Sequence, residues 1–140
     1  MKDVVVAIGL WLLGSVAFAQ TFTSTAGGPI PDGAGVGPNN YGAPLDVPIL
    51  VSGVAQGTID TVSVAFNANH TWVGDLEVTL ISPYGQEHLL FARTGATDAG
   101  LGSPANLVAA NAHTFSDTAV NNWWTVAGAA DVTIPASTAR

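Results

Sequence analysis

The chain has 140 residues, a formal net charge of −7, 48% apolar residues, only 9% charged residues and no cysteine. Three basic residues cannot neutralise a run of phosphates, which argues against nucleic-acid partners and anionic membrane surfaces. Without cysteine the chain has no disulfide, thiolate nucleophile or cysteine-ligated metal, whereas its apolar content is sufficient for a folded domain.

Residues 1–19 have the order of a secretory signal peptide: a charged start, a short apolar stretch and the small-x-small tripeptide 17–19. The apolar stretch is shorter than the roughly 20 residues that span a bilayer. We therefore predict cleavage between Ala19 and Gln20, and a secreted or periplasmic mature protein without a stable membrane span. The alternative is an uncleaved N-terminal anchor, because Asp3 weakens the positive start.

The next segment, residues 20–46, is rich in glycine and proline and cannot form a regular helix. It is expected to be an exposed N-terminal lead whose end is anchored by Tyr41, Leu45 and Val47 to a domain over residues 47–140. A linker, or a strand edge with irregular pairing, is the alternative for this segment.

Within the domain, apolar residues follow a period of two. Residues 49–54, 59–66, 75–82 and 87–93 are predicted strands, and the turn residues at 82–85 predict a hairpin between the last two. The turn-rich stretch 94–119 is expected to be a long loop or a pair of loops, and residues 131–134 a weak strand. No segment after the signal has a sustained helical stripe, so the predicted class is all-β, with a sandwich favoured over a barrel.

An ordered set of motifs within residues 59–93 carries a family resemblance. In chain order the set is a strand, His70-Thr-Trp-Val-Gly74-Asp75-Leu76, alternating apolar residues, Ser82-Pro83-x-Gly85, an apolar pair and Arg93. This order resembles the P domain, or P/Homo B domain, which follows the subtilisin-like catalytic domain in kexin- and furin-type proprotein convertases and in many secreted bacterial proteases. With looser matches at 115–117 and 134–136, the resemblance covers about residues 47–140.

The resemblance implies a galactose-binding-like, jelly-roll β-sandwich without catalytic residues, associated with serine-type endopeptidase activity and proteolysis. Its partner would be a subtilisin-like protease domain that it stabilises or modulates. The closing Gly-Thr-Trp-Thr-Leu-like strand of the family is not found before Arg140. We therefore expect an incomplete sandwich with exposed edges, either a fragment or a short form completed by a partner strand.

The motif residues have architectural roles in this interpretation. His70 is expected to pair with Asp75 across a turn, and Gly74 to adopt a backbone angle closed to other residues. Ser82, with Pro83 and Gly85, sets the hairpin reversal. Arg93 is expected to meet an acidic side chain or strand-end carbonyls.

Catalytic chemistry has weak support in the sequence. His70, His88 and His113 with Asp75 and Ser82 supply the residue types of a serine hydrolase, but no nucleophile-elbow motif is found, so no catalytic residue is predicted. The three histidines also lack the paired spacing of a zinc site.

Two binding alternatives stay open. Asp98, Asn111 and Asp117 are candidate calcium ligands in oxygen-rich loops, but no calcium-loop motif is found, and solvated turn residues are the favoured explanation. Trp72, Trp123 and Trp124 are candidate contacts for a carbohydrate or another protein. In an extended segment, adjacent Trp123 and Trp124 point to opposite faces, which predicts one in the core and one exposed.

Overall fold

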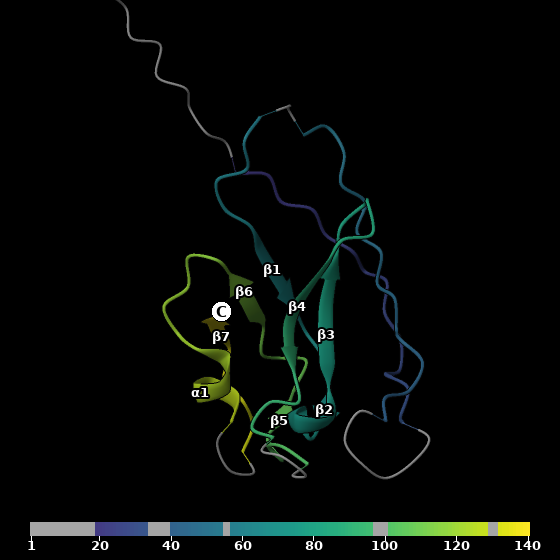
Figure 1. The fold of residues 1–140 in the computed structure, drawn as a ribbon, viewed down its shortest axis with the longest axis vertical. Helices are drawn as coiled ribbons and strands as arrows, with labels where there is room; N and C mark the ends of the chain where they lie inside the picture. The colour runs from purple at the N-terminus through teal and green to yellow at the C-terminus, as the bar shows by residue number, and fades with distance from the viewer. Residues whose placement is uncertain (1–18, 34–39, 55–56, 97–100, 129–131) are drawn as a thin grey trace, which may run out of the picture.

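The computed structural model describes residues 19–33, 40–54, 57–96, 101–128 and 132–140. The predicted signal peptide therefore lies outside the described residues up to position 18. The all-β prediction is confirmed, since the described elements are short strands with one 3-10 turn and one helical turn (Figure 1). In chain order they are β1 (Ser63–Phe66), β2 (His70–Thr71), η1 (Val73–Asp75), β3 (Glu77–Ile81), β4 (Glu87–Ala92), β5 (Asn106–Leu107), β6 (His113–Ser116), α1 (Trp123–Ala127) and β7 (Ser137–Ala139).

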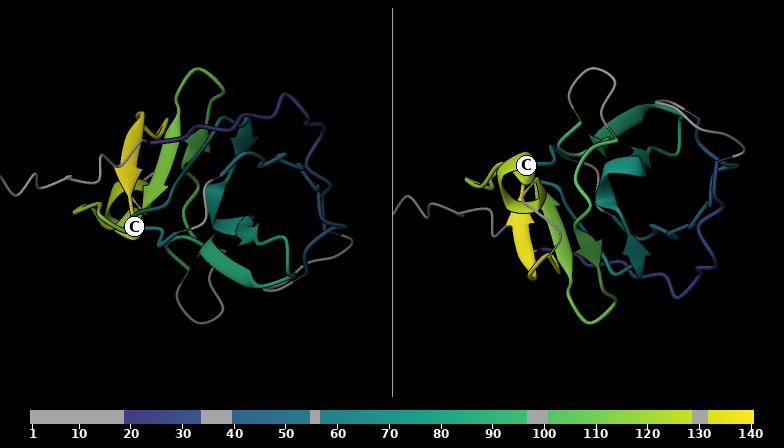
Figure 2. Two further views of the ribbon diagram at one scale, coloured as in Figure 1. Left: turned by 90° about the horizontal axis from the view of Figure 1, so that it is seen from above. Right: turned by 90° about the horizontal axis from the view of Figure 1, so that it is seen from below.

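The described strands form three small sheets. One has the order β1-β6-β7, with β1 antiparallel and β7 parallel to the central strand β6. The second pairs β2 with β5, and the third is the antiparallel β3–β4 hairpin, whose register shifts between Val78 and Thr79. Figure 2 shows residues 40–54 running around the outside of the hairpin, on the side away from β7.

Aromatic side chains join the hairpin to the β1-β6-β7 sheet. The ring of Phe91 on β4 lies 6.2 Å from Phe66 on β1 and 5.6 Å from Phe115 on β6. Trp123 of α1 closes the group at 4.8 Å from Phe91. Phe91, Phe115 and Trp123 are each at most 5% exposed, so these rings form the centre of the core between two layers.

The strand predictions succeed where both strands of a pair are close in sequence. The hairpin over 75–82 and 87–93 is confirmed, although Asp75 belongs to η1 and the first strand begins at Glu77. The strand over 59–66 is confirmed only for Ser63–Phe66.

The predicted strand over residues 49–54 is wrong. This segment has no regular structure, and its Leu50 is 83% exposed. Gly53 has a φ of 70°, which interrupts an extended backbone. An apolar run with β-branched residues has the propensity for a strand, but no described strand pairs with it.

The C-terminal half departs most from the prediction. The stretch 94–119 was expected to be a long loop or a pair of loops, but it contains the strands β5 and β6, which the sequence did not reveal. In the predicted strand 131–134, Asp131 lies outside the described residues and Thr133 forms only an isolated bridge to Asn106. Strand β7 and helix α1 were not predicted, because elements of three and five residues are too short to show a period.

The N-terminal lead packs against the core through a residue that was not among the expected anchors. Ile30 contacts the buried cluster. Tyr41 and Leu45 are each 37% exposed and Val47 is 44% exposed, so these residues are partly covered but lie outside that cluster, and their anchoring role stays a prediction. The lead therefore lies against the domain from a point earlier in its sequence.

Candidate functional site

The turn between β2 and β3 contains a short hydrogen bond between two side chains. The His70 Nε2 atom lies 2.6 Å from Asp75 Oδ1, which confirms the predicted pairing. His70 is 16% exposed and Asp75 is 61% exposed at the side chain. This bond ties the end of β2 to η1, and because the carboxylate is solvated it orients the imidazole more than it stabilises the fold.

Trp72 makes this turn possible with an unusual backbone. Its φ of 98° lies in the left-handed region that non-glycine residues rarely occupy. Its indole Nε1 donates to the Leu101 carbonyl at 3.0 Å, and the N–H groups of Trp72 and Val73 donate to the Ala105 carbonyl at 3.3 and 2.8 Å. These bonds hold the strained residue in place.

The reason predicted for Gly74 is wrong. Its φ is not in the left-handed region, and the structure instead requires glycine because another backbone passes directly over it. A Cβ atom at this position would lie 2.5 Å from the Ser103 nitrogen and 2.6 Å from the Gly102 carbonyl carbon. Gly102 has a φ of 78°, and a Cβ atom added to it would lie 2.7 Å from the Gly74 Cα atom. The two glycines allow the turn and the 101–103 segment to touch.

The reversal between β3 and β4 is confirmed as the predicted turn. The Ser82 hydroxyl accepts hydrogen bonds from the N–H groups of Tyr84 at 3.3 Å and Gln86 at 3.0 Å. Gly85 has a φ of 78°, and its N–H donates to the Ser82 carbonyl at 2.9 Å. With Pro83 supplying a fixed φ, the Ser82 hydroxyl serves as the acceptor that shapes the turn.

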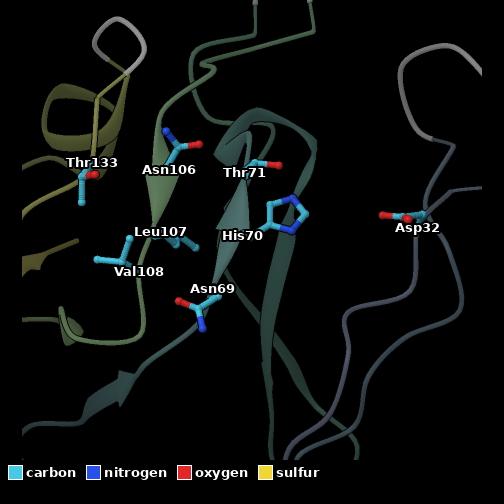
Figure 3. A pocket seen from close by; sticks show the side chains of 8 residues that line it. All are labelled: Asp32, Asn69, His70, Thr71, Asn106, Leu107, Val108 and Thr133. Carbon is cyan, nitrogen blue, oxygen red and sulfur yellow. The ribbon is translucent and has the colours of Figure 1, made fainter.

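An open pocket of about 640 Å³ lies beside the His70 ring. Asp32, from the N-terminal lead, faces the ring from the opposite side of the pocket (Figure 3). The full lining is Asp32, Asn69, His70, Thr71, Asn106, Leu107, Val108 and Thr133. Asp32 and Asn106 were not predicted as site residues, because no local motif relates them to His70.

His113 is a second histidine whose position the sequence did not reveal. It lies on the central strand β6, is fully buried, and its ring stands 5.9 Å from Phe66 and 5.6 Å from Trp123. The Nδ1 atom lies 3.4 Å from the Ser137 hydroxyl, and within the described structure Nε2 has no hydrogen-bond partner. Burial lowers the pKa of His113, because the charged imidazolium loses its hydration.

Comparison of the sequence with known protein families gives a match. Residues 59–126, from before β1 to within α1, match the family model of the proprotein convertase P-domain. This part of the chain belongs to the P-domain family. The match lies inside the predicted domain at 47–140 and includes the His70–Asp75 turn and the Ser82 turn.

The chain is also similar to part of a larger protein. Leupeptin-inactivating enzyme 1 from Streptomyces exfoliatus is 34% identical over 122 residues, which cover 85% of this chain and 25% of the relative. The chain thus spans about a quarter of the length of that relative. No solved structure gives a significant match.

Arg93 of the P domain ends the hairpin with a positive φ of 46°. Its N–H donates to the Leu76 carbonyl and its own carbonyl accepts from Ala96, both at 2.9 Å. The pKa of Tyr41 is raised chiefly by burial and also by the negative charge of Glu77. The positive charge of Arg93 acts in the opposite direction and lowers that pKa. The contact predicted for its guanidinium stays a prediction.

The tryptophans of the P domain separate as predicted, but on a helical turn. Trp123 is 2% exposed and donates from Nε1 to the Thr94 hydroxyl at 2.8 Å, whereas Trp124 is 47% exposed. Adjacent residues on a helix differ in direction by about 100°, which also separates them. Trp72 is 39% exposed, and neither it nor Trp124 lines the pocket, so a shared aromatic platform finds no support.

The calcium candidates of the P domain have protein contacts where they are described. Asn111 donates from Nδ2 to the Ile134 carbonyl at 2.7 Å, and Asp117 Oδ2 accepts from the Val62 N–H at 3.4 Å. Asp98 lies outside the described residues. In the ranges that the structure describes, no three His, Asp or Glu side chains form a group able to hold a metal ion, so calcium stays a prediction.

The three histidines lie on three different strands. His70 is on β2, His113 is on β6, and His88 is on β4, where it is paired with Leu80. Across the described residues, no helix has the length and apolarity needed to cross a membrane.

Proposed function

We propose that this P domain is a secreted, non-catalytic module that folds against a subtilisin-like serine protease domain and stabilises or modulates it. The observation that carries the proposal is that the side chains of His70 and Ser82 form structural hydrogen bonds. The His70 ring is bonded to Asp75, and the Ser82 hydroxyl accepts from the turn backbone at the other end of β3. The endopeptidase activity associated with the family would then belong to a partner domain.

An exposed apolar surface supports a protein partner. Ile81 is 55% exposed and Leu89 is 61% exposed, and the register of β3 and β4 places both on the outer face of the hairpin. Tyr84, at the tip of the same hairpin, is 93% exposed. Large apolar side chains gathered on one element are typical of a contact surface, because exposing them to water is unfavourable.

The interaction can be tested with a purified subtilisin-like protease domain that lacks its own P domain. We expect the mature chain to form a complex with it and to lengthen the half-life of protease activity at elevated temperature. Leu89→Asp should weaken the complex, since it places a charge in the proposed contact. Val120→Asp is the matched control, because Val120 is 87% exposed and lies between β6 and α1, outside the hairpin.

Two outcomes would contradict the proposal. Labelling of Ser82 by a serine-directed fluorophosphonate probe would make the chain itself a hydrolase. Absence of both a complex and a change in protease half-life would remove the partner role.

Secretion is the second part of the proposal. It rests on the order of residues 1–19 as a signal peptide. Expression of the full chain in a bacterial host with an export pathway should give a protein outside the cytoplasm whose first residue is Gln20. N-terminal sequencing checks this, and an intact Met1 on the cell-associated protein would refute it.

A further inference from the structure

The pocket beside His70 is lined by both polar and apolar side chains, and it contains a carboxylate without a described hydrogen bond. Asp32 is exposed, and no hydrogen bond or ion pair joins its carboxylate to another described residue. Across the pocket, His70 is already held by Asp75 at 2.6 Å. Figure 3 shows the Asp32 carboxylate directed at the space in front of the His70 ring.

The position of Asp32 is set by close packing within the lead. A Cβ atom on Gly42 would lie 2.5 Å from the Asp32 carbonyl oxygen, and one on Gly33 would collide with the Asn40 backbone. The stretches on either side of the gap at 34–39 therefore lie side by side. The Asp32 backbone is therefore packed closely against Gly42, while its exposed side chain is available to a ligand.

The wall around His70 offers a hydroxyl oxygen. The Asn69 side chain is positioned by its Oδ1, which accepts from the Ala109 N–H at 2.8 Å. Thr71 stands next to His70 in the lining, whereas Thr133 lies at the far end of the pocket from Asp32 (Figure 3). A threonine hydroxyl accepts hydrogen bonds from a cationic donor, so Thr71 is the acceptor on the Asp32 side of the pocket.

The charge of the chain selects the ligand class. With ten acidic and three basic residues, the molecule attracts cations and repels anions. A guanidinium group matches a carboxylate with two parallel hydrogen bonds and has further donors for neighbouring hydroxyls. A volume of about 640 Å³ is larger than one side chain requires, so part of the adjoining peptide fits as well.

We propose that this pocket binds a basic side chain of a polypeptide, with Asp32 as the counter-ion of its guanidinium group. The interaction is independent of any protease partner, because every group named belongs to this chain. It gives the P domain a recognition site for arginine-containing peptides, separate from the outer face of the hairpin.

The test is direct titration of the mature chain with a blocked Gly-Arg-Gly peptide at low salt, followed by calorimetry or NMR shifts. We expect binding by the arginine peptide that weakens as salt is added, and no binding by the matched Gly-Gln-Gly peptide. Asp32→Asn should weaken binding about fivefold, as expected for a partly exposed ion pair. Asp46→Asn is the control, since Asp46 is an exposed carboxylate of the same lead outside the pocket lining.

Three outcomes of this titration would contradict the proposed arginine site. Equal binding of the arginine and glutamine peptides, equal weakening by the two substitutions, or no binding of the arginine peptide would each overturn the proposal. Thermal melting of both variants should match the wild type, because neither carboxylate has a described partner. The protease experiments use the hairpin variants, so failure of one proposal is distinguishable from failure of the other.

Discussion

Replacing Gly74 by alanine tests whether the close contact in the β2–β3 turn is required by the fold. The added Cβ would lie 2.5 to 2.6 Å from backbone atoms of Leu101, Gly102 and Ser103. Real Cβ contacts are not shorter than 3.0 Å, so one backbone segment must move by about half an ångström. These atoms are backbone, and they cannot move away by a side-chain rotation.

The size of the effect follows from two opposing terms. Overpacking of this kind costs up to about 3 kcal/mol. The loss of backbone freedom in the unfolded chain returns about 0.4–1 kcal/mol. We therefore expect Gly74→Ala to lower the free energy of unfolding by about 2 kcal/mol, which lowers the melting temperature by about 8 °C in a domain of this size.

The assay is thermal and urea unfolding followed by circular dichroism, with Gly57→Ala as the matched control. A methyl group on Gly57 would have no atom within 4 Å, and the φ of this residue is not left-handed, so alanine there should be neutral or stabilise slightly. If Gly74→Ala melts at the same temperature as Gly57→Ala, the turn and residues 101–103 do not approach one another closely enough to require glycine, and the packing argument is refuted.

Three further predictions concern the core and α1. Burial lowers the pKa of His113, and its aromatic neighbours Phe66 and Trp123 carry no charge, so the unfolded state binds the proton at a higher pH than the folded state. The free energy of unfolding should therefore fall as the pH drops below about 6.5, by at most about 1.4 kcal/mol per pH unit. A pH slope that is unchanged in His113→Gln, or that disappears in the exposed control His88→Gln, would contradict this. Trp123→Phe should lower the free energy of unfolding, measured with urea, by about 2 kcal/mol, because it removes the hydrogen-bond partner of the buried Thr94 hydroxyl at 2.8 Å and shortens a core side chain. Trp124→Phe, at an exposed position, is the control. Asn122→Ala should cost about 1 kcal/mol, because its Oδ1 caps α1 at 2.9 and 3.3 Å, and retention of full stability would argue against that cap.

The local parts of the candidate site were predictable because their residues are near one another in sequence. His70 and Asp75 flank one turn, and the Ser82 turn is encoded by adjacent turn formers between two alternating strands. The separation of Trp123 and Trp124 into one buried and one exposed residue was also predictable, although the predicted backbone was extended and the structure has a capped helical turn.

Contacts between distant segments were not predictable. The need for glycine at position 74 comes from residues 101–103, and the pocket joins Asp32 of the lead to β2 and β5. The exposed run at 49–54 has strand composition without a partner strand, whereas β7 pairs with β6 despite its small polar residues. Strand formation depends on backbone hydrogen bonds to a neighbour as well as on side-chain pattern.

Composition and local order alone predicted an all-β chain, ruled out cysteine chemistry, argued against nucleic-acid partners and revealed the motifs of a P domain. Only the tertiary structure decided which histidine is buried, which glycine lies under another backbone and which carboxylate faces the pocket. The physical reason is that burial and close approach depend on contacts between segments far apart in the chain. A pattern over a few residues carries no information about which distant segment packs against it.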